Sequence, residues 1–410
     1  MTVDIFKHSS GIEVIFDKND SPLVGINFRV NVGSSNENSK QKGISHYIEH
    51  MAFTGTSKLS KEQITKYTEQ TGAYINAYTD YTNTTYTLKC MTTNFSTCLG
   101  VLSDMLTDCQ FFEEEFQKEK GVILQEISDR TNNPNIVAYD QLFNSIYKDE
   151  GMNTQIIGTK EHVSSFTRDD LIAYYKDFYI PNNMVLSVSG NVSKEDILSV
   201  LDEYFSKESS TGIVTEEKEF TITDNKDIVY NNSFSQDTLV WVFKLNHTPC
   251  LKINTLRNIV NMYLGSGFSS ILVKKFRSEL GLVYGISSHI YSIGKYNDIL
   301  IINTNCESDK SDTINKELGS TIQQLKKFDQ DDLTYCKNMA KFNVANSFES
   351  KTKAASNNIY EYKYYGKIST YDENISIIDD ITLDDCHKFI DELLAIEPIK
   401  FISKSSKKEV

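Results

Sequence analysis

Long apolar runs and clusters of basic residues are both missing from this sequence. A membrane-spanning helix needs about 18 or more consecutive apolar residues, and no run in the chain approaches that length. The 42 Lys and Arg residues are interspersed with 56 Asp and Glu residues, which gives a net charge of −14. We therefore expect neither nucleic acid nor a membrane as a partner. If much of the negative charge lines a binding cavity, the protein would favour basic peptides.

Cysteine pairs and targeting segments are missing too. The seven cysteines are odd in number and widely spread, and no Cys-x-x-Cys pair occurs. This pattern indicates reduced, mostly buried thiols. The N-terminus shows neither a basic segment followed by an apolar one nor an Arg-rich amphipathic segment. The sequence therefore predicts a soluble protein of the reducing cytoplasm.

The length of 410 residues predicts two domains, since single hydrophobic cores stop growing well below that size. Residues 206–219 are rich in Ser, Thr, Lys and Glu and have few apolar residues, which is typical of a linker. We therefore expect a first domain at 1–208 and a second at 217–410. The second half repeats the order of elements of the first, which predicts two α+β domains of one layout. Each would be a mostly antiparallel sheet covered by helices on one face.

Local patterns place the first elements of this fold. Alternating apolar residues in 12–32 predict a hairpin, and residues 73–91 predict another. Residues 43–53 have a helical pattern. Ser60 and Gln63 form a capping box that starts a second helix.

Two histidines in the first of these helices have the spacing of metal ligands. His46 and His50 stand at positions i and i+4, which lie on one face of a helix about 6 Å apart. Glu49 comes one residue before the second histidine, so it would lie beside the metal. The arrangement His-x-x-Glu-His is the inverted zincin, or inverzincin, motif. The sequence therefore predicts a zinc site with Glu49 as general base.

A third ligand is expected from a later helix. Glu119 and Glu126 are about two turns apart and lie on the same face, so either carboxylate could reach the ion. Two imidazoles and one carboxylate leave a fourth position open, as catalytic zinc requires. The alternative is that both histidines are surface residues of an amphipathic helix and that the glutamates only solvate it.

Several segments of the chain resemble the M16 zinc metallopeptidases, the family of pitrilysin, insulin-degrading enzyme and the mitochondrial processing peptidase. Residues 33–37 and 43–56 are similar to the metal helix of that family with its lead-in and exit. Residues 122–126 are similar to its third-ligand segment. This resemblance implies Glu126 as the third ligand of one Zn²⁺ per chain and Glu119 as a residue that supports the site.

The resemblance also implies substrate-binding residues. Residues 276–285 look like the family segment whose Arg and Tyr reach the metal site from the partner domain. Arg277 would then bind substrate carbonyls, and Tyr284 would stabilise the oxyanion. Asn76 and Ala77 match the edge strand on which substrates of the family pair as an added strand.

A chain of two such domains resembles the short-chain branch, whose members pair into a four-domain chamber. The metal motif and the Arg/Tyr segment occur in one chain, so a homodimer is expected. The resemblance implies a metalloendopeptidase that hydrolyses short or unfolded peptides by metal-activated water. The alternative is a non-catalytic or partner-dependent subunit of a complex similar to the processing peptidase.

Overall fold

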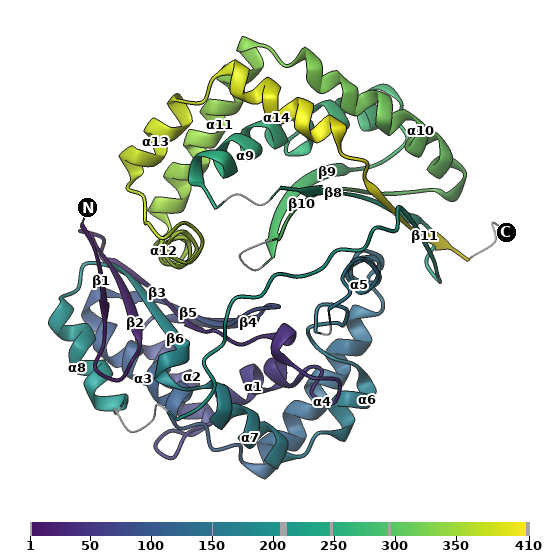
Figure 1. Cartoon of the computed structure of the whole chain (residues 1–410). Coiled ribbons are helices and arrows are strands. Elements are labelled where there is room, and N and C mark those ends of the chain that lie inside the picture. Colours follow the sequence, from purple (N-terminus) through teal and green to yellow (C-terminus); the bar gives the residue numbers. More distant parts are fainter. Residues whose placement is uncertain (1, 150, 206–210, 247–248, 294–296, 407–410) are drawn as a thin grey trace. The chain divides into compact units, whose positions relative to one another are not determined.

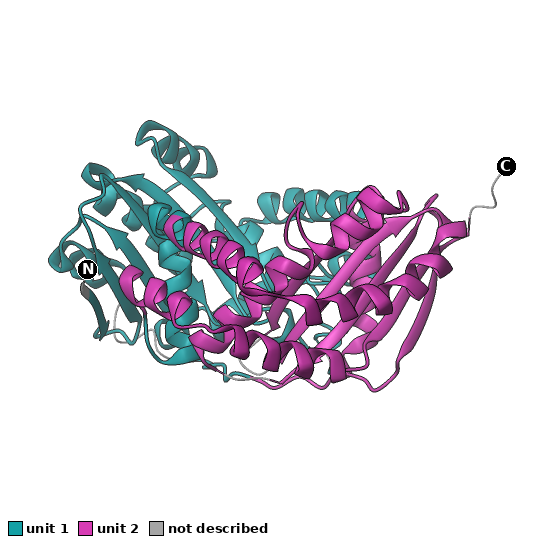
Figure 2. Ribbon diagram, turned by 90° about the horizontal axis from the view of Figure 1, so that it is seen from above, with its two compact units in different colours: residues 1–129, 149–217, 346–368 teal, residues 130–148, 218–345, 369–410 magenta. Residues whose placement is uncertain are grey.

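The computed structural model describes residues 2–149, 151–205, 211–246, 249–293 and 297–406. The chain is divided into two compact units (Figure 2). Unit 1 comprises Met1–Asp129, Asp149–Glu217 and Asn346–Ile368, and unit 2 comprises Arg130–Lys148, Lys218–Ala345 and Ser369–Val410. One change of unit falls at Glu217, inside the predicted linker, of which residues 206–210 lie outside the described residues. The expected division at 1–208 and 217–410 differs from these units, because residues 130–148 and 346–368 each belong with the other half of the sequence.

Unit 1 is built on a six-stranded sheet of order β1-β2-β6-β3-β5-β4. All neighbouring strands run antiparallel except β2 and β6, so the sheet is mostly antiparallel, as predicted. The strands are β1 (Thr2–Lys7), β2 (Glu13–Lys18), β3 (Leu23–Val30), β4 (Tyr74–Thr79), β5 (Thr84–Met91) and β6 (Met184–Gly190).

The two predicted hairpins differ in outcome. Strands β4 and β5 pair antiparallel, which confirms the hairpin at 73–91. Strands β2 and β3 both form, but the predicted hairpin at 12–32 is wrong because β6 lies between them. Val14 is the partner of Leu186, and Ile26 is the partner of Val188. The turn residues correctly indicated that the chain reverses between β2 and β3. They could not show that β6, from much later in the sequence, pairs between these two strands.

Most helices of unit 1 pack on one face of this sheet (Figure 1). The core between them contains the fully buried side chains of Phe28, Tyr47 and Leu99. The predicted capping box starts α2, where Ser60 accepts a hydrogen bond from the backbone of Gln63. The helices are α1 (Ile44–Ala52), α2 (Lys61–Gln70), α3 (Phe95–Thr107), α4 (Glu113–Arg130), α6 (Lys160–Ser165), α7 (Arg168–Phe178) and α8 (Lys194–Tyr204).

The opposite face of the unit 1 sheet is partly covered by α12 (Lys351–Tyr365), which comes from the second half of the sequence. This helix packs against β3 and β6. The Asn27 side-chain amide donates a hydrogen bond of 2.9 Å to the carbonyl of Thr352. At Gly25 the helix backbone is so close that an added Cβ would lie 2.1 Å from the carbonyl carbon of Lys351. Glycine is therefore required here by close approach of two backbones.

Unit 2 has the same plan with a five-stranded sheet of order β7-β11-β8-β10-β9. Trp241 lies in the core between this sheet and the helices on one face. A single helix from the first half, α5 (Pro134–Ile146), packs on β7, β8 and β11. The strands are β7 (Asp227–Asn232), β8 (Asp237–Leu245), β9 (Ile286–Ile293), β10 (Asn297–Cys306) and β11 (Ile399–Ser405). The other helices are α9 (Leu251–Gly265), α10 (Ser311–Ile322), α11 (Gln330–Glu349), α13 (Tyr371–Asp379) and α14 (Leu383–Ala395).

Two α+β units of similar layout are thus confirmed, with one exchanged helix on the second face of each sheet. Six of the seven cysteines are buried, and Cys250 is half-buried. Among the described residues, no helix combines the length and apolar character that a membrane span requires.

Replacement of Gly25 by Ala tests the packing of α12. The added methyl group would overlap the helix backbone, so we expect the free energy of unfolding to fall by about 1–3 kcal/mol. Urea denaturation followed by circular dichroism measures it. The matched control is Gly121→Ala in α4, where nothing lies within 4 Å of the added Cβ; a helical glycine replaced by alanine should gain about 0.5–1 kcal/mol. Equal effects of the two substitutions would contradict the close approach.

Candidate metal centre

Helix α1, which carries the inverzincin motif, begins at a position that only glycine tolerates easily. Gly43 is the N-cap with φ of 95°, and as a glycine it has no side chain that could cap the helix. Glu37 replaces that missing cap. Its carboxylate accepts hydrogen bonds from the backbone N–H of Gly43 (2.8 Å) and of Ser45 (2.9 Å). Burial raises the pKa of Glu37 to about 7, although both N–H groups act in the opposite direction.

One face of α1 is fully buried, and its packing determines where the opposite face of the helix points. Tyr47, Ile48 and Met51 have no exposed surface. The Tyr47 ring stacks on Phe116 of α4 with centroids 5.2 Å apart, and its hydroxyl donates to the Phe116 carbonyl. Helices α1 and α4 are therefore held side by side, with the remaining face of α1 next to α4 at the surface.

His46, His50 and Glu126 meet at this surface. The imidazole rings have centroids 4.7 Å apart. The Nε2 atoms of His46 and His50 lie 3.8 and 3.7 Å from one carboxylate oxygen of Glu126, and one possible ligand atom from each residue lies within 4.8 Å of the others. The three side chains are 14%, 22% and 42% exposed, so solvent reaches the cluster from one side. Two imidazoles and one carboxylate that converge at this separation fit a Zn²⁺ ion with an open coordination position.

Glu119 orients His50. Its carboxylate lies 3.1 Å from His50 Nδ1, and because a carboxylate only accepts hydrogen bonds, Nδ1 carries the proton and Nε2 is left with its lone pair. The hydrogen bond from His50 and the ammonium of Lys61 hold the pKa of Glu119 below its usual range against the effect of burial. Burial lowers the pKa of His50, but Glu119 and the other carboxylates outweigh burial and leave it raised.

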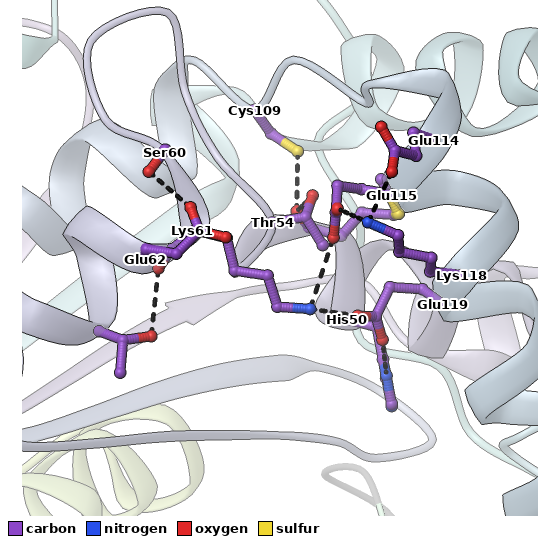
Figure 3. Close-up of polar contacts among 12 residues, drawn as sticks. His50, Thr54, Ser60, Lys61, Glu62, Cys109, Glu114, Glu115, Lys118 and Glu119 are labelled. Atoms are coloured by element: carbon purple, nitrogen blue, oxygen red, sulfur yellow. Dashed lines mark hydrogen bonds and ion pairs between the residues drawn. The ribbon is translucent and has the colours of Figure 1, made fainter.

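Lys61 links α2 to this network. Its ammonium lies 2.9 Å from the second carboxylate oxygen of Glu119 and 3.5 Å from Glu115 (Figure 3). Glu119 is therefore fixed on both sides, by an imidazole from α1 and by an ammonium from α2. This arrangement restricts the rotation of His50 about its own side-chain bonds.

Glu49 lies beside the cluster and is held by the sheet. Only 8% of the residue is exposed. Thr79, the last residue of β4, donates a hydrogen bond of 2.6 Å from its hydroxyl to one carboxylate oxygen of Glu49. Burial raises the pKa of Glu49, and this hydrogen bond opposes the rise. A carboxylate with a raised pKa, fixed by one neutral hydroxyl, is suited to exchange a proton.

The remaining predicted site residues belong to other elements of the two units. Asn76 and Ala77 are on β4, the last strand of the unit 1 sheet. Arg277 belongs to the π-helical segment η5 (Val273–Glu279) of unit 2, and Tyr284 follows it with 89% of its surface exposed. The Arg277 guanidinium stacks 5.1 Å from the Tyr284 ring centroid and 5.8 Å from that of Phe268. The structure thus groups the four residues of the metal centre with Glu119, and separately groups Arg277 with Tyr284.

Three contributing residues were missed by the sequence interpretation: Glu37, Lys61 and Thr79. Glu37 lies before the helix that it caps, in a segment with no capping pattern of its own. Lys61 was visible only as the first residue after the Ser60 cap. Thr79 had a usable signal, since alternation along β4 places it on the same face as Ala77, toward the helices.

Similar proteins were found by sequence and by structure. The family described as insulinase (peptidase family M16) matches residues 13–160, and the one described as peptidase M16 inactive domain matches residues 165–340. An uncharacterized zinc protease of Rickettsia felis is 31% identical over 369 residues, which cover 88% of this chain and 87% of that protein. The mitochondrial-processing peptidase subunit beta of Neurospora crassa is 32% identical over 186 residues, or 45% and 39% of the two chains.

The crystal structure of a protease from Helicobacter pylori has a similar fold. It matches with a TM-score of 0.88 and covers 98% of this chain and 99% of that one. The two sequences are 19% identical. Similarity at that identity shows the fold alone.

Replacement of Glu119 by Gln tests its hold on His50. An amide accepts more weakly and carries no charge, so His50 should lose its fixed tautomer and zinc affinity should fall about 10–100-fold. Competition with a chromogenic chelator measures the zinc dissociation constant. The matched control is Glu114→Gln on the same helix, because Glu114 is 81% exposed and pairs with Lys118. Zinc affinity that is equal in both variants would contradict the role of Glu119.

Proposed function

This chain belongs to the M16 family of peptidases, and on that basis we propose that it is a zinc-dependent endopeptidase of short or unfolded peptides. One observation carries the proposal: the donor atoms of His46, His50 and Glu126 converge beside the buried carboxylate of Glu49. A hydrolytic zinc centre needs three protein ligands, an open position and an adjacent base. These residues supply each of them. One Zn²⁺ per chain is expected.

Each residue then has a defined part in hydrolysis. When bound, Zn²⁺ would lower the pKa of a water molecule and polarise the scissile carbonyl. Glu49 takes the proton of the attacking water and returns it to the leaving amine. Thr79 holds one oxygen of Glu49 and so keeps the carboxylate in place. Glu119 keeps the proton of His50 on Nδ1 and so orients Nε2.

Four further residues would bind the substrate. Strand β4 has one free edge in the described sheet, where an extended peptide could pair through its backbone beside Asn76 and Ala77. This mode of binding requires little sequence selectivity. The exposed Tyr284 would stabilise the oxyanion of the tetrahedral intermediate. Arg277, stacked on the Tyr284 ring, would bind substrate carbonyls.

We further propose a cytoplasmic homodimer, in which two chains enclose the substrate in a chamber. The relative from Neurospora crassa is named as a subunit, so a complex of different chains is the other possible assembly. The protein would then be partner-dependent. Peptide cleavage by the purified chain in the absence of any other protein separates the two assemblies.

Metal removal tests the reaction. The purified chain should cleave a quenched basic peptide of about 15 residues, a chelator should stop cleavage, and added zinc should restore it, because the ion supplies the activated water. Fluorescence release measures the rate. An acidic peptide of equal length is the control for charge preference and should be cleaved more slowly if the net charge of −14 lines the site. One bound zinc without cleavage of any peptide would contradict catalysis by the isolated chain.

Replacement of Glu49 by Gln tests the base separately from the metal. The amide cannot accept the proton of water, so kcat should fall at least about 1,000-fold while zinc remains bound at one equivalent. Turnover and bound metal are measured on the same sample. Glu69→Gln on the exposed surface of α2 is the matched control and should change neither quantity. Retained turnover in the Glu49 variant would show that another group is the base.

A further inference from the structure

Strand β4 carries two exposed tyrosines on one face. Side chains along this strand alternate, and Tyr74, Asn76 and Tyr78 are exposed while the residues between them are half-buried. Tyr74 is 64% exposed and Tyr78 is 46% exposed. Large aromatic side chains usually bury most of their surface, so two of them at alternate positions of one edge strand need an explanation.

These tyrosines lie on the sheet face opposite the core. Ile75 and Ala77 pack against the helices of unit 1, so the side chains between them point the other way. Tyr74 is paired with Lys89 on β5, which is in turn paired with Gly25 on β3. Helix α12 packs directly over Gly25. Tyr74 therefore lies two strands, or about 10 Å, from that contact, and Tyr78 lies four residues further along the same edge strand and on the same face.

The same strand leads into the candidate metal centre. Its last residue, Thr79, is hydrogen-bonded to Glu49. Within the described residues β4 pairs with one neighbour, β5, and its second edge is free for another strand. A peptide that adds to this edge is therefore continuous with the place where Glu49 acts. Its alternate side chains would lie directly beside Tyr74 and Tyr78.

We propose that Tyr74 and Tyr78 select substrates with an aromatic or β-branched residue at two positions four residues apart. The inference rests on the proposed function and adds a preference to it. Opposed side chains in neighbouring strands have Cβ atoms about 5 Å apart, and aromatic residues pair there with aromatic or β-branched ones. Positions i and i+4 of a strand are about 13 Å apart, which matches the spacing of the two tyrosines.

The neighbouring residues define the rest of the preference. Lys89 stands across from Tyr74 on β5, on the side away from the added peptide, so the peptide residue opposite Tyr74 lies two strand spacings, or about 10 Å, from Lys89 and does not oppose it directly. Asn76 lies between the two tyrosines on the same face, which favours a polar residue at the middle position. Apolar residues at both ends with a polar one between them form the expected pattern.

Cleavage of a peptide set tests the preference. Quenched peptides of about 15 residues carry Phe, Val or Ser at positions i and i+4, and the pair is moved along the peptide one residue at a time. In the best register we expect kcat/KM to rise roughly two- to five-fold for each Phe or Val that replaces Ser. Tyr74→Ser and Tyr78→Ser should each remove the preference at one of the two positions. Tyr74→Phe and Tyr78→Phe should keep it, because the ring and not the hydroxyl makes the contact.

Controls separate this proposal from the proposed function. Tyr371→Ser removes another exposed tyrosine, 37% exposed, from unit 2 and should leave the preference intact. Binding of the same peptides to zinc-loaded Glu49→Gln protein is measured by fluorescence anisotropy. Cleavage by the wild-type protein without a Phe or Val preference, or with a preference that survives both serine variants, would overturn the selection by these tyrosines and leave the peptidase function standing. Selective binding without cleavage by the wild-type protein would support the selection and overturn the peptidase function. Neither binding nor cleavage of any peptide would overturn both.

Discussion

Burial of one face of α1 is the constraint on which the candidate site depends. Tyr47, Ile48 and Met51 exclude water completely, and the stacking of Tyr47 on Phe116 fixes α1 against α4. Each buried side chain of this size contributes roughly 1.5–3 kcal/mol, so the helix cannot rotate about its axis without a large loss. The imidazoles on the next face are thereby aimed at the carboxylates of α4. A metal site made from two helices gains its precision from apolar packing behind it.

The repulsion among the carboxylates of the candidate site is reduced by their neighbours. Three carboxylates, those of Glu49, Glu119 and Glu126, surround two imidazoles, and like charges so close would repel in a half-buried place. Glu119 is compensated by the ammonium of Lys61, and Glu49 is held by a neutral hydroxyl and has a raised pKa. Glu126 remains the most exposed of the three. The environment thus gives three identical side chains three different properties.

The exchange of α5 and α12 gives each sheet a helix on its second face. A sheet buried on one face only leaves the other to water. The close approach of α12 to Gly25 and its hydrogen bond from Asn27 tie the second half of the sequence into unit 1. Helix α12 covers only part of this second face, since it packs mainly over β3 and β6, whereas the exposed tyrosines are on β4. Among the described strands, β4 is thus an edge strand with one unpaired backbone edge and exposed side chains.

The sequence alone determined the features that rest on local geometry. A spacing of four in a helix brings His46 and His50 together, a capping box starts α2, and alternation makes β4 and β5 a hairpin. Two carboxylates on α4 remained equivalent until the resemblance favoured Glu126, and the fold then placed Glu126 at Nε2 of both histidines and Glu119 at Nδ1 of one. Only the tertiary structure decided that β6 separates β2 from β3, that Glu37 caps α1 and that Thr79 holds Glu49. Each of these depends on contacts between residues far apart in the chain or outside regular elements, and periodicity carries no information about such contacts.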